Sequence, residues 1–301
     1  MTTKHFELTD YTITVDGRTL HRIRATRDIP EQGVKAGELG GYVESEENIW
    51  GTAWVLGDAQ VSGNALVYGD AQVYGDAQVY GDALVYGDAQ VYGDAQVYGD
   101  AQVLGDAQVY GDAQVSGDAQ VYGNAQVSGK AWVSGDALVS GKAWVSGNAQ
   151  VYGDALVSGK AWVSGNALVY GDAQVYGDAQ VSGKAWVYGD AQVYGNAQVS
   201  GDAQVSGKAR VSDNQHVLTL APIGSESVSM TLARQKPGTQ QTVTIGCWTG
   251  PIDDMTAEVE RRARKWEGTE QDKKRWRDEY TLAEKLCRTR MTMWEQEKEP
   301  K

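Results

Sequence analysis

Aspartates recur six residues apart through the middle of the chain, and regularly spaced carboxylates are suited to binding cations or basic partners. If the chain winds with 18 residues per turn, every third aspartate falls into one column. We name the longest such column the acidic ladder; it comprises Asp82, Asp100, Asp118, Asp136, Asp154, Asp172 and Asp190. Like charges about 5 Å apart repel by roughly 1 kcal/mol even in water, so the acidic ladder needs a compensating interaction.

The simplest compensation is a hydrogen bond from a backbone N–H at the bend to each carboxylate, which Asp side chains make readily. Two alternatives stay open. Neighbouring carboxylates could hold Ca²⁺, although we expect no dedicated metal site and no cofactor. The acidic ladder could also imitate a nucleic-acid backbone and so inhibit a host DNA-binding or defence protein.

Residue types that perform catalysis are scarce and scattered. The three histidines, His5, His21 and His216, all lie outside the repeat, and the repeat contains no insertion that could shape a substrate site. Cys247 and Cys287 have no CxxC motif or neighbouring histidine that would favour metal or thiol chemistry. The sequence therefore predicts no catalytic residues and a protein that is not an enzyme.

The carboxylates are positioned by a six-residue repeat, because a glycine stands at every sixth position from Gly51 to Gly207. Each hexad reads approximately G-[DNK]-A-x-V-[YS]. Ala and Val lie two residues apart and so share one side of an extended strand, while the residue between them points the other way. Gly followed by Asp, Asn or Lys makes the bend, and a glycine at this spacing excludes a helix.

One short strand cannot bury its apolar face alone, so the hexads must stack on one another. The 27 hexads give nine turns of three, with the alanines and valines packed along the axis. The predicted fold class is therefore an all-β solenoid, a parallel β-helix with three hexads per turn. It carries a small N-terminal β cap and a C-terminal α+β cap domain.

The outward residue of the hexad is mostly Gln in the first half of the repeat and becomes apolar later. We name the later apolar residues the apolar band: Trp132, Leu138, Trp144, Leu156, Trp162, Leu168 and Trp186. Exposed apolar bands usually mark contacts, so we expect a homo-oligomer or a complex with a host protein. The alternative is that these apolar side chains stack on one another from turn to turn and so cover their own surface without a partner. The outward tyrosines are expected to stack across strands, and a sugar-binding surface is the alternative.

These residues resemble a known family. The Ala-x-Val spacing is similar to the hexapeptide motif of left-handed β-helices, and the resemblance implies the left-handed winding. The segments "GRTLHRIRATRDI" (17–29), "VKAGELGGYVESEENI" (34–49) and "IGCWTGPIDDM" (245–255) resemble those of YdcK-like hexapeptide-repeat proteins of tailed phages and prophages, mostly of unknown function. Many hexapeptide-repeat proteins are acyltransferases with a histidine base, which makes an acyltransferase-like enzyme the alternative from another class.

Three regions differ in composition: 1–50, 51–212 and 213–301. The first contains a hairpin signal at Asp16-Gly17 and is expected to cap the repeat. The third reads as three short strands from 216 to 248 and a helix begun by Asp253 or Asp254 that runs to about Trp266. A long helix from Thr269 to about Gln296 follows. Its stripe of Trp276, Tyr280, Ala283, Cys287 and Trp294 is expected to pack on the C-terminal strands, with a partner-binding helix as the alternative.

The net charge of −13 argues against direct binding of nucleic acid or of acidic membranes. No apolar run reaches the length of a membrane helix, and the start of the chain has no targeting segment. We therefore expect a cytoplasmic protein, in the host cell if a phage encodes it. The leading hypothesis is a non-catalytic structural or interaction protein that binds itself or a host protein.

Overall fold

The computed structural model describes residues 4–296, and the chain divides into two compact units, 1–166 and 167–301. The boundary between the units lies inside the repeat. Each unit is described by itself below. Together their hexads make about nine turns of parallel strands, as the repeat length predicts.

The first unit begins with an antiparallel module. Its elements are β1 (Phe6–Val15), β2 (Arg18–Ala25), η1 (Pro30–Gln32), β3 (Leu39–Val43) and η2 (Glu46–Asn48). Strands β1 and β2 form the predicted hairpin, in which Asp16 and Gly17 adopt positive φ values of 48° and 79°. Strand β3 pairs with β2 and then, in parallel, with the solenoid strand β5 (Gln60–Val61). The module thus continues one sheet of the solenoid and covers its first turn.

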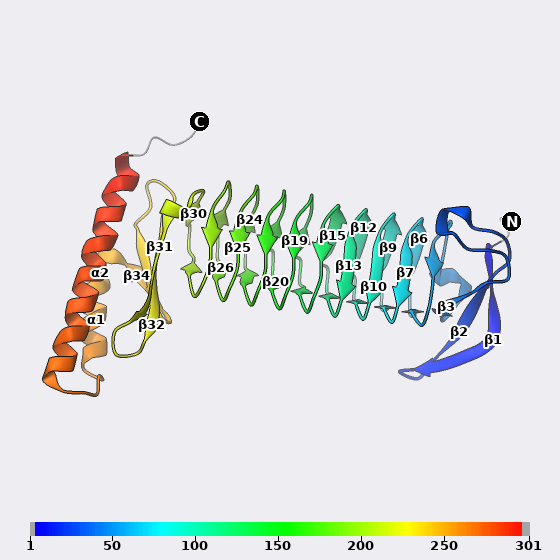
Figure 1. The fold of residues 1–301 in the computed structure, drawn as a ribbon, viewed down its shortest axis with the longest axis horizontal. Coiled ribbons are helices and arrows are strands. Elements are labelled where there is room, and N and C mark those ends of the chain that lie inside the picture. Colours follow the sequence, from blue (N-terminus) through cyan, green and yellow to red (C-terminus); the bar gives the residue numbers. More distant parts are fainter. Residues whose placement is uncertain (1–3, 297–301) are drawn as a thin grey trace. The chain divides into compact units, whose positions relative to one another are not determined.

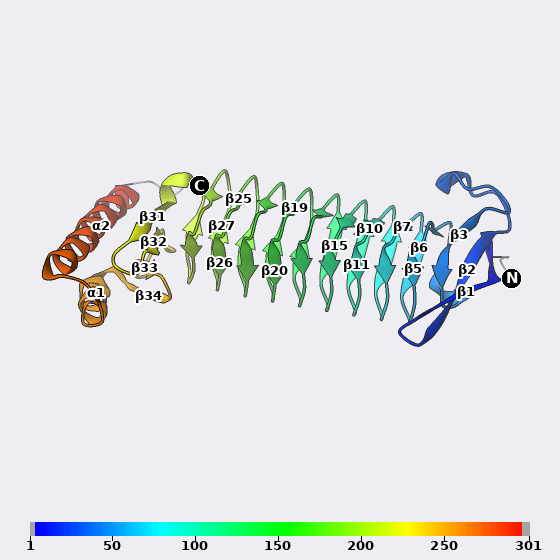
Figure 2. The same ribbon diagram turned by 60° about the horizontal axis from the view of Figure 1, so that its bottom comes forward.

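The solenoid strands of the first unit form three parallel sheets (Figures 1 and 2). The β5 sheet contains β5, β8 (Gln78–Val79), β11 (Gln96–Val97), β14 (Gln114–Val115), β17 (Trp132–Val133) and β20 (Gln150–Tyr152). The β4 sheet contains β4 (Trp54–Val55), β7 (Gln72–Gly75), β10 (Gln90–Gly93), β13 (Gln108–Gly111), β16 (Gln126–Val127), β19 (Trp144–Val145) and β22 (Trp162–Val163). The β6 sheet contains β6 (Leu66–Gly69), β9 (Leu84–Gly87), β12 (Gln102–Gly105), β15 (Gln120–Gly123), β18 (Leu138–Val139) and β21 (Leu156–Val157).

The register confirms three hexads per turn. Gln90 pairs with Gln72 on one side and with Gln108 on the other, so equivalent residues 18 positions apart lie side by side. The alanines and valines of the hexads are completely buried, with at most 1% of their surface exposed. Burial of a valine contributes roughly 1.5–3 kcal/mol, so this repeated pair supplies the core along the whole repeat.

The bend explains why the glycine spacing never slips. Gly129 has φ +68°, in the left-handed region that favours glycine, and a Cβ built on it would lie 3.0 Å from the backbone N and O of Gly147 in the next turn. The following residue closes the bend, since the backbone N–H of Lys130 donates to the carbonyl of Gly147 at 2.7 Å. A side chain at Gly129 would therefore push these two turns apart.

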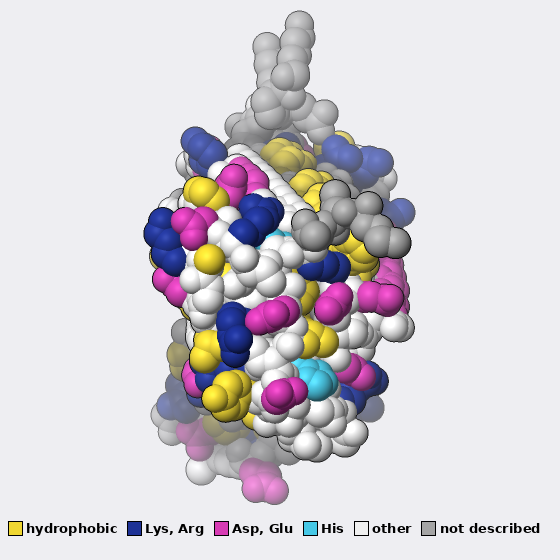
Figure 3. Space-filling model, turned by 90° about the vertical axis from the view of Figure 1, so that its right-hand side faces the viewer, with side chains coloured by type: hydrophobic (Ala, Val, Ile, Leu, Met, Phe, Trp, Pro, Cys, Tyr) yellow, Lys and Arg dark blue, Asp and Glu magenta, His cyan; other side chains and the backbone are white. Residues whose placement is uncertain are grey.

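The N-terminal module changes the environment of the first hexads. Trp54 occupies an outward position of its hexad but is only 3% exposed, because the module covers it. The ring of His5 lies 6.1 Å from its indole, and His5 Nε2–H donates to the carbonyl of Ala53 at 2.9 Å. On the outer side of this end, charged side chains of both signs are mixed with isolated hydrophobic ones (Figure 3). The cap therefore replaces an open strand edge with an ordinary polar surface.

The second unit continues with solenoid strands and ends in an α+β region. Its solenoid strands are β23 (Leu168–Tyr170), β24 (Gln174–Val175), β25 (Gln180–Val181), β26 (Trp186–Tyr188), β27 (Gln192–Val193), β28 (Gln198–Val199), β29 (Gln204–Val205) and β30 (Arg210–Val211). They are followed by η3 (Asn214–His216), β31 (Val217–Ile223), β32 (Val228–Ala233), β33 (Thr242–Ile245), β34 (Trp248–Pro251), η4 (Ile252–Asp254), α1 (Met255–Ala263) and α2 (Glu270–Gln296).

The C-terminal sheet has four antiparallel strands in the order β31-β32-β33-β34, where the sequence predicted three. The turn at Gly246-Cys247 is short enough for Trp248–Pro251 to fold back on β33 as a fourth strand. Helix α1 ends at Ala263, before the predicted Trp266, and its N-cap Asp254 makes no side-chain capping bond. Helix α2 matches its predicted range. Its residues Tyr280, Ala283, Cys287 and Trp294 are buried in the core with the strands, so this stripe packs internally as expected.

Candidate interaction surface

The apolar band presents a stacked pair of indoles on the β4 sheet. Trp144 pairs in register with Trp162, with ring centroids 5.4 Å apart and ring planes 9° from parallel. The two side chains remain 39% and 41% exposed. Because the indole faces cover each other, their edges are what a partner would meet. This geometry suits packing against a protein surface better than the flat aromatic face that a sugar requires.

The other members of the apolar band lie where the 18-residue turn places them. Leu138 pairs with Leu156 on the β6 sheet, and Trp132 lies on the β5 sheet, paired with Gln150 and 42% exposed. In the second unit Leu168 pairs with Trp186, which is 40% exposed. The members in the first unit therefore spread over three faces, with the two ladders on different sheets.

Serines of the preceding turn hold the indoles in place, a feature that the sequence analysis missed. The Nε1–H groups of Trp132, Trp144 and Trp162 donate to the hydroxyls of Ser116, Ser128 and Ser146 at 3.1, 2.9 and 3.1 Å. Each serine stands 16 residues before its tryptophan, where many other hexads carry tyrosine. The sequence signal was this pairing of Trp with an earlier Ser.

Lysines accompany the tryptophans in the same hexads. The word G-K-A-W-V occurs four times, with the pairs Lys130/Trp132, Lys142/Trp144, Lys160/Trp162 and Lys184/Trp186. Residues 51–128 contain ten aspartates and no Lys or Arg, whereas residues 129–166 contain three lysines and two aspartates. The exposed indoles of the apolar band in the first unit therefore lie where the acidic charge is relieved.

Within each unit the acidic ladder lies in register on successive turns, but its carboxylates do not make the expected backbone bonds. Its members precede the strands of the β6 sheet in the first unit, and Asp172 and Asp190 precede the paired strands β24 and β27 in the second. Within residues 4–296, no ladder carboxylate has a hydrogen bond from a backbone N–H; Asp82 instead accepts from the Asn64 side chain at 2.9 Å. The backbone N–H at the bend already donates to the next turn's glycine, as in Asp82 to Gly99 at 2.9 Å. Exposure to water is therefore what limits the repulsion.

The acidic ladder gives the Ca²⁺ alternative no geometric support. Among the described residues, no group of three or more His, Cys, Asp or Glu side chains is arranged to hold a metal ion. Consecutive ladder residues present one carboxylate per turn, whereas Ca²⁺ takes six to eight oxygen ligands.

Tyrosines stack across turns, as predicted. Tyr74, Tyr92 and Tyr110 lie on successive turns of the β4 sheet, with centroid separations of 4.7 and 4.9 Å and nearly parallel rings. Burial in this stack raises the pKa of Tyr92, and the neighbouring Tyr74 and Tyr110 raise it further. Like the indoles, these rings expose edges and not faces.

The histidine side chains lie within hydrogen-bonding distance of other parts of the chain. His21 Nδ1 lies 3.2 Å from the carbonyl of Thr9. His216 is buried; its Nε2 accepts from Arg234 at 2.7 Å, and its Nδ1 lies 3.1 Å from the hydroxyl of Ser212. Because Arg234 can only donate, Nε2 of His216 is the acceptor of that bond, while Nδ1 lies 3.2 Å from the backbone nitrogen of Ser212.

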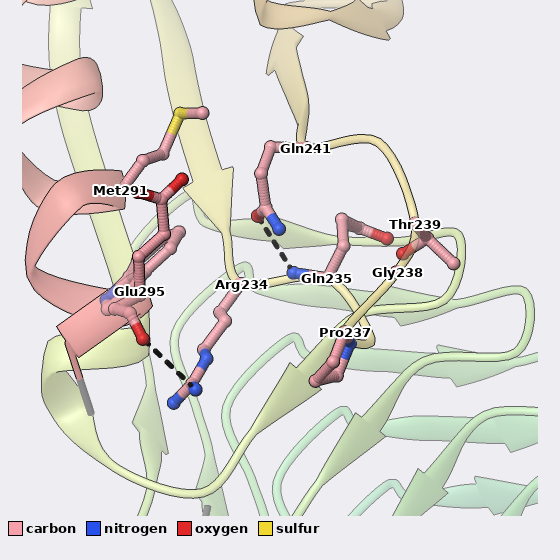
Figure 4. A pocket seen from close by; sticks show the side chains of 9 residues that line it. Arg234, Gln235, Pro237, Gly238, Thr239, Gln241, Met291 and Glu295 are labelled. Carbon is pink, nitrogen blue, oxygen red and sulfur yellow. Dashed lines mark hydrogen bonds between the residues drawn. The ribbon is translucent and has the colours of Figure 1, made fainter. Parts of the chain in front are cut away.

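A pocket adjoins this cluster in the second unit. This pocket, of about 390 Å³, lies between the β32–β33 connection and the end of α2 (Figure 4). Arg234 reaches across it to the carbonyl of Trp294 at 3.5 Å, and the backbone N–H of Gln235 donates to the Gln241 side chain at 3.1 Å. These polar groups join the walls of the pocket to each other.

No helix among residues 4–296 has both the length and the apolar character needed to cross a membrane. A search of curated proteins finds no match. A family model described as the YdcK β-solenoid repeat matches the chain at residues 59–76, 77–93, 89–105, 95–111, 113–129, 119–135, 149–165, 161–177, 173–189 and 191–207. The matched segments share the stacked Ala-x-Val strands described above. Within residues 59–207, the chain is therefore similar to the YdcK β-solenoid repeat over these segments.

Proposed function

We propose that this chain is a non-catalytic structural protein that acts by binding proteins, either a second copy of itself or a protein of the host cell. The observation that carries the proposal is the stacked, exposed Trp144–Trp162 pair on a parallel sheet. Serine hydroxyls fix both indoles, so little side-chain entropy is lost when a partner covers them. Ordered aromatic side chains of this kind are typical of the centres of protein interfaces.

The engagement of the histidines supports the non-catalytic part of the proposal. His216, the candidate base of the acyltransferase alternative, is buried and bonded to Arg234 and Ser212. Turnover of an acyl-CoA that is lost in His216→Ala would contradict this part. The same assay on His21→Ala controls for loss of a structural histidine.

The mass of the protein in solution tests the binding surface. We expect Trp144→Gln/Trp162→Gln to lower the average mass in sedimentation experiments, because the variant removes both exposed indoles. Leu66→Gln is the matched control, since Leu66 is an outward residue 37% exposed and outside the apolar band. A wild-type chain that is monomeric at high concentration, with the double variant unchanged, would contradict self-association.

A phage or prophage origin and a cytoplasmic location belong to the same proposal. The origin rests on the resemblance of segments 17–29 and 34–49. The location rests on the two cysteines, Cys247 and Cys287, which are both free thiols as suits a reducing compartment.

A further inference from the structure

We propose that two copies of this chain pair through the β4 sheet, antiparallel to each other, about a two-fold axis through the hexad of Asn124 and Gln126. This inference rests on the proposed function and identifies both the partner and the face. The axis runs along the strand direction. Rotation about this axis therefore reverses the order of turns in the second copy. The bends that precede the β4 sheet in one copy still lie opposite the bends that precede the β4 sheet in the other.

The charges at the bend that precedes the β4 sheet change sign along the solenoid. In order of turns this column reads Asp70, Asp88, Asp106, Asn124, Lys142, Lys160, and all six side chains are exposed. The register from Gln72 to Trp162 places them on successive turns. Asn124 is the neutral midpoint, with Asp106 one turn before it and Lys142 one turn after.

An antiparallel pair makes the five-turn part of this column from Asp88 to Lys160 complementary to itself. Lys142 of one copy meets Asp106 of the other, Lys160 meets Asp88, and Asn124 meets Asn124. The two-fold axis repeats each ion pair on the other side. Pairing also reduces the like-charge repulsion inside each column. The stacked aspartates of one copy gain lysine neighbours from the other copy, and the stacked lysines gain aspartate neighbours.

The other two faces of the first unit lack this symmetry. Before the β6 sheet the column is Asn64, Asp82, Asp100, Asp118, Asp136, Asp154, which would repel a second copy in any alignment. Before the β5 sheet it is Asp58, Asp76, Asp94, Asp112, Lys130, Asn148, with a single lysine. The β4 sheet is therefore the face of the first unit whose charges select a second copy of the same chain.

Side-chain sizes on the β4 sheet are complementary in the same alignment. Trp144 meets Gln108, and the small Ser146 meets Tyr110. The wide indole edges on the later turns of one copy thus face glutamine amides on the earlier turns of the other copy. The stacked tyrosines on those earlier turns face serines. An isologous contact requires this kind of self-complementary pattern.

The contact is small, which sets the expected affinity. Five turns spaced about 4.8 Å apart give a contact about 25 Å long, small against stable interfaces that bury about 800 Å² per partner. We therefore expect a dissociation constant in the micromolar range that rises with ionic strength.

Charge reversal tests the pairing. We expect Lys142→Asp/Lys160→Asp to weaken self-association at least about tenfold at low salt, because each reversed residue faces an aspartate of the other copy. Adding Asp88→Lys/Asp106→Lys to the same chain makes the earlier turns positive and the later turns negative. Opposite charges then face each other again, so association should be restored. Asp82→Lys/Asp100→Lys on the β6 sheet is the matched control and should not weaken it.

Cross-linking tests the alignment. In a Cys247→Ser background, Gln126→Cys lies on the axis and should be joined to itself by a bis-maleimide spanning about 10 Å, the separation of packed sheets. Gln120→Cys, at the same level on the β6 sheet, should not. A mixture of Gln90→Cys and Ser164→Cys chains should cross-link, whereas each alone should not, because only antiparallel chains bring 90 and 164 together.

The outcomes separate the two proposals. Association that survives charge reversal, or cross-linking of Gln90→Cys to itself, overturns the antiparallel pairing and leaves the proposed function standing. If Trp144→Gln/Trp162→Gln abolishes association while charge reversal leaves it unchanged, the antiparallel pairing is likewise overturned and the proposed function stands. A monomeric wild-type chain that shows none of these cross-links overturns both the pairing and self-association.

Discussion

The solenoid of residues 51–166 and the C-terminal region of residues 217–296 bury their apolar side chains in different ways. In the solenoid the same small pair, Ala and Val, is buried in every hexad, and each strand contacts equivalent strands one turn away. In the C-terminal region large and varied side chains, among them Leu232, Met255 and Tyr280, fill a single core. A repetitive stack distributes its stability over nearest neighbours, while a single core depends on a few residues.

Buried charge sharpens this contrast. The C-terminal region contains an ion pair between Glu258 and Arg262 at 2.7 Å, with both side chains about 5% exposed. Arg262 also donates to the carbonyl of Ile245 at 2.7 Å. The solenoid core has only apolar side chains, and its charges lie outside at the bends. Single substitutions should therefore have larger effects in the C-terminal region.

The largest effect is expected for Glu258→Gln. It leaves the buried Arg262 without its full counter-charge and should lower the free energy of unfolding of the C-terminal region by about 3–5 kcal/mol. Denaturant unfolding followed by near-UV circular dichroism measures this. Glu260→Gln is the control on the same helix, because Glu260 pairs with Arg277 at the surface, and it should cost less than about 1 kcal/mol. If both variants lowered the free energy of unfolding equally, the buried ion pair would contribute no more to stability than the surface pair.

Alkaline pH should also act on the C-terminal region. Burial raises the pKa of Tyr280 from 10.0 to about 12. The protonated phenol is thus favoured in the fold, and its stabilising effect is complete below pH 10 and is lost as the pH rises through about 12. We expect this loss to be on the order of 2 kcal/mol. A Tyr280→Phe variant should lack this alkaline step, and an unchanged pH profile would contradict the role of Tyr280.

In the solenoid, Gly129→Ala should lower the free energy of unfolding by about 2 kcal/mol. The cost combines the left-handed backbone with the close approach of Gly147. Gly201→Ala is the matched control, because Gly201 has φ +66° but nothing within 4 Å of an added Cβ. Thermal unfolding of the two variants separates crowding from backbone strain. Equal melting temperatures would mean that the turns can move apart freely.

The smallest effect is expected for Ser146→Ala, which removes the hydroxyl that accepts from the Trp162 indole at 3.1 Å. The bond is exposed, so the loss should be about 0.5–1 kcal/mol or less. Tryptophan fluorescence anisotropy should fall, since the indole edge becomes free to move. Ser134→Ala, on a serine with no indole bond in the described structure, should leave the anisotropy unchanged.

The regularity of the repeat is what made the solenoid predictable. Ala-x-Val on a six-residue period leaves one way to bury the apolar pair, and Gly at the bend sets the length of each side. The resulting 18-residue turn places Trp144 beside Trp162 and Asp82 beside Asp100 from the sequence alone. The C-terminal region has no period, so the fourth strand and the early end of α1 depended on contacts between distant residues. The burial of Trp54 likewise required the N-terminal module to fold over it.

The sequence by itself determined the turn length, the buried and exposed sides of each hexad, and the columns of charge and aromatic rings. It could do so because each of these follows from contacts between residues a fixed 18 positions apart. Only the tertiary structure decided that the bend N–H groups bond to glycine carbonyls and leave the carboxylates to solvent. It also decided that serines one turn earlier fix the indoles. Both depend on hydrogen-bond geometry between neighbouring turns, which side-chain periodicity does not specify.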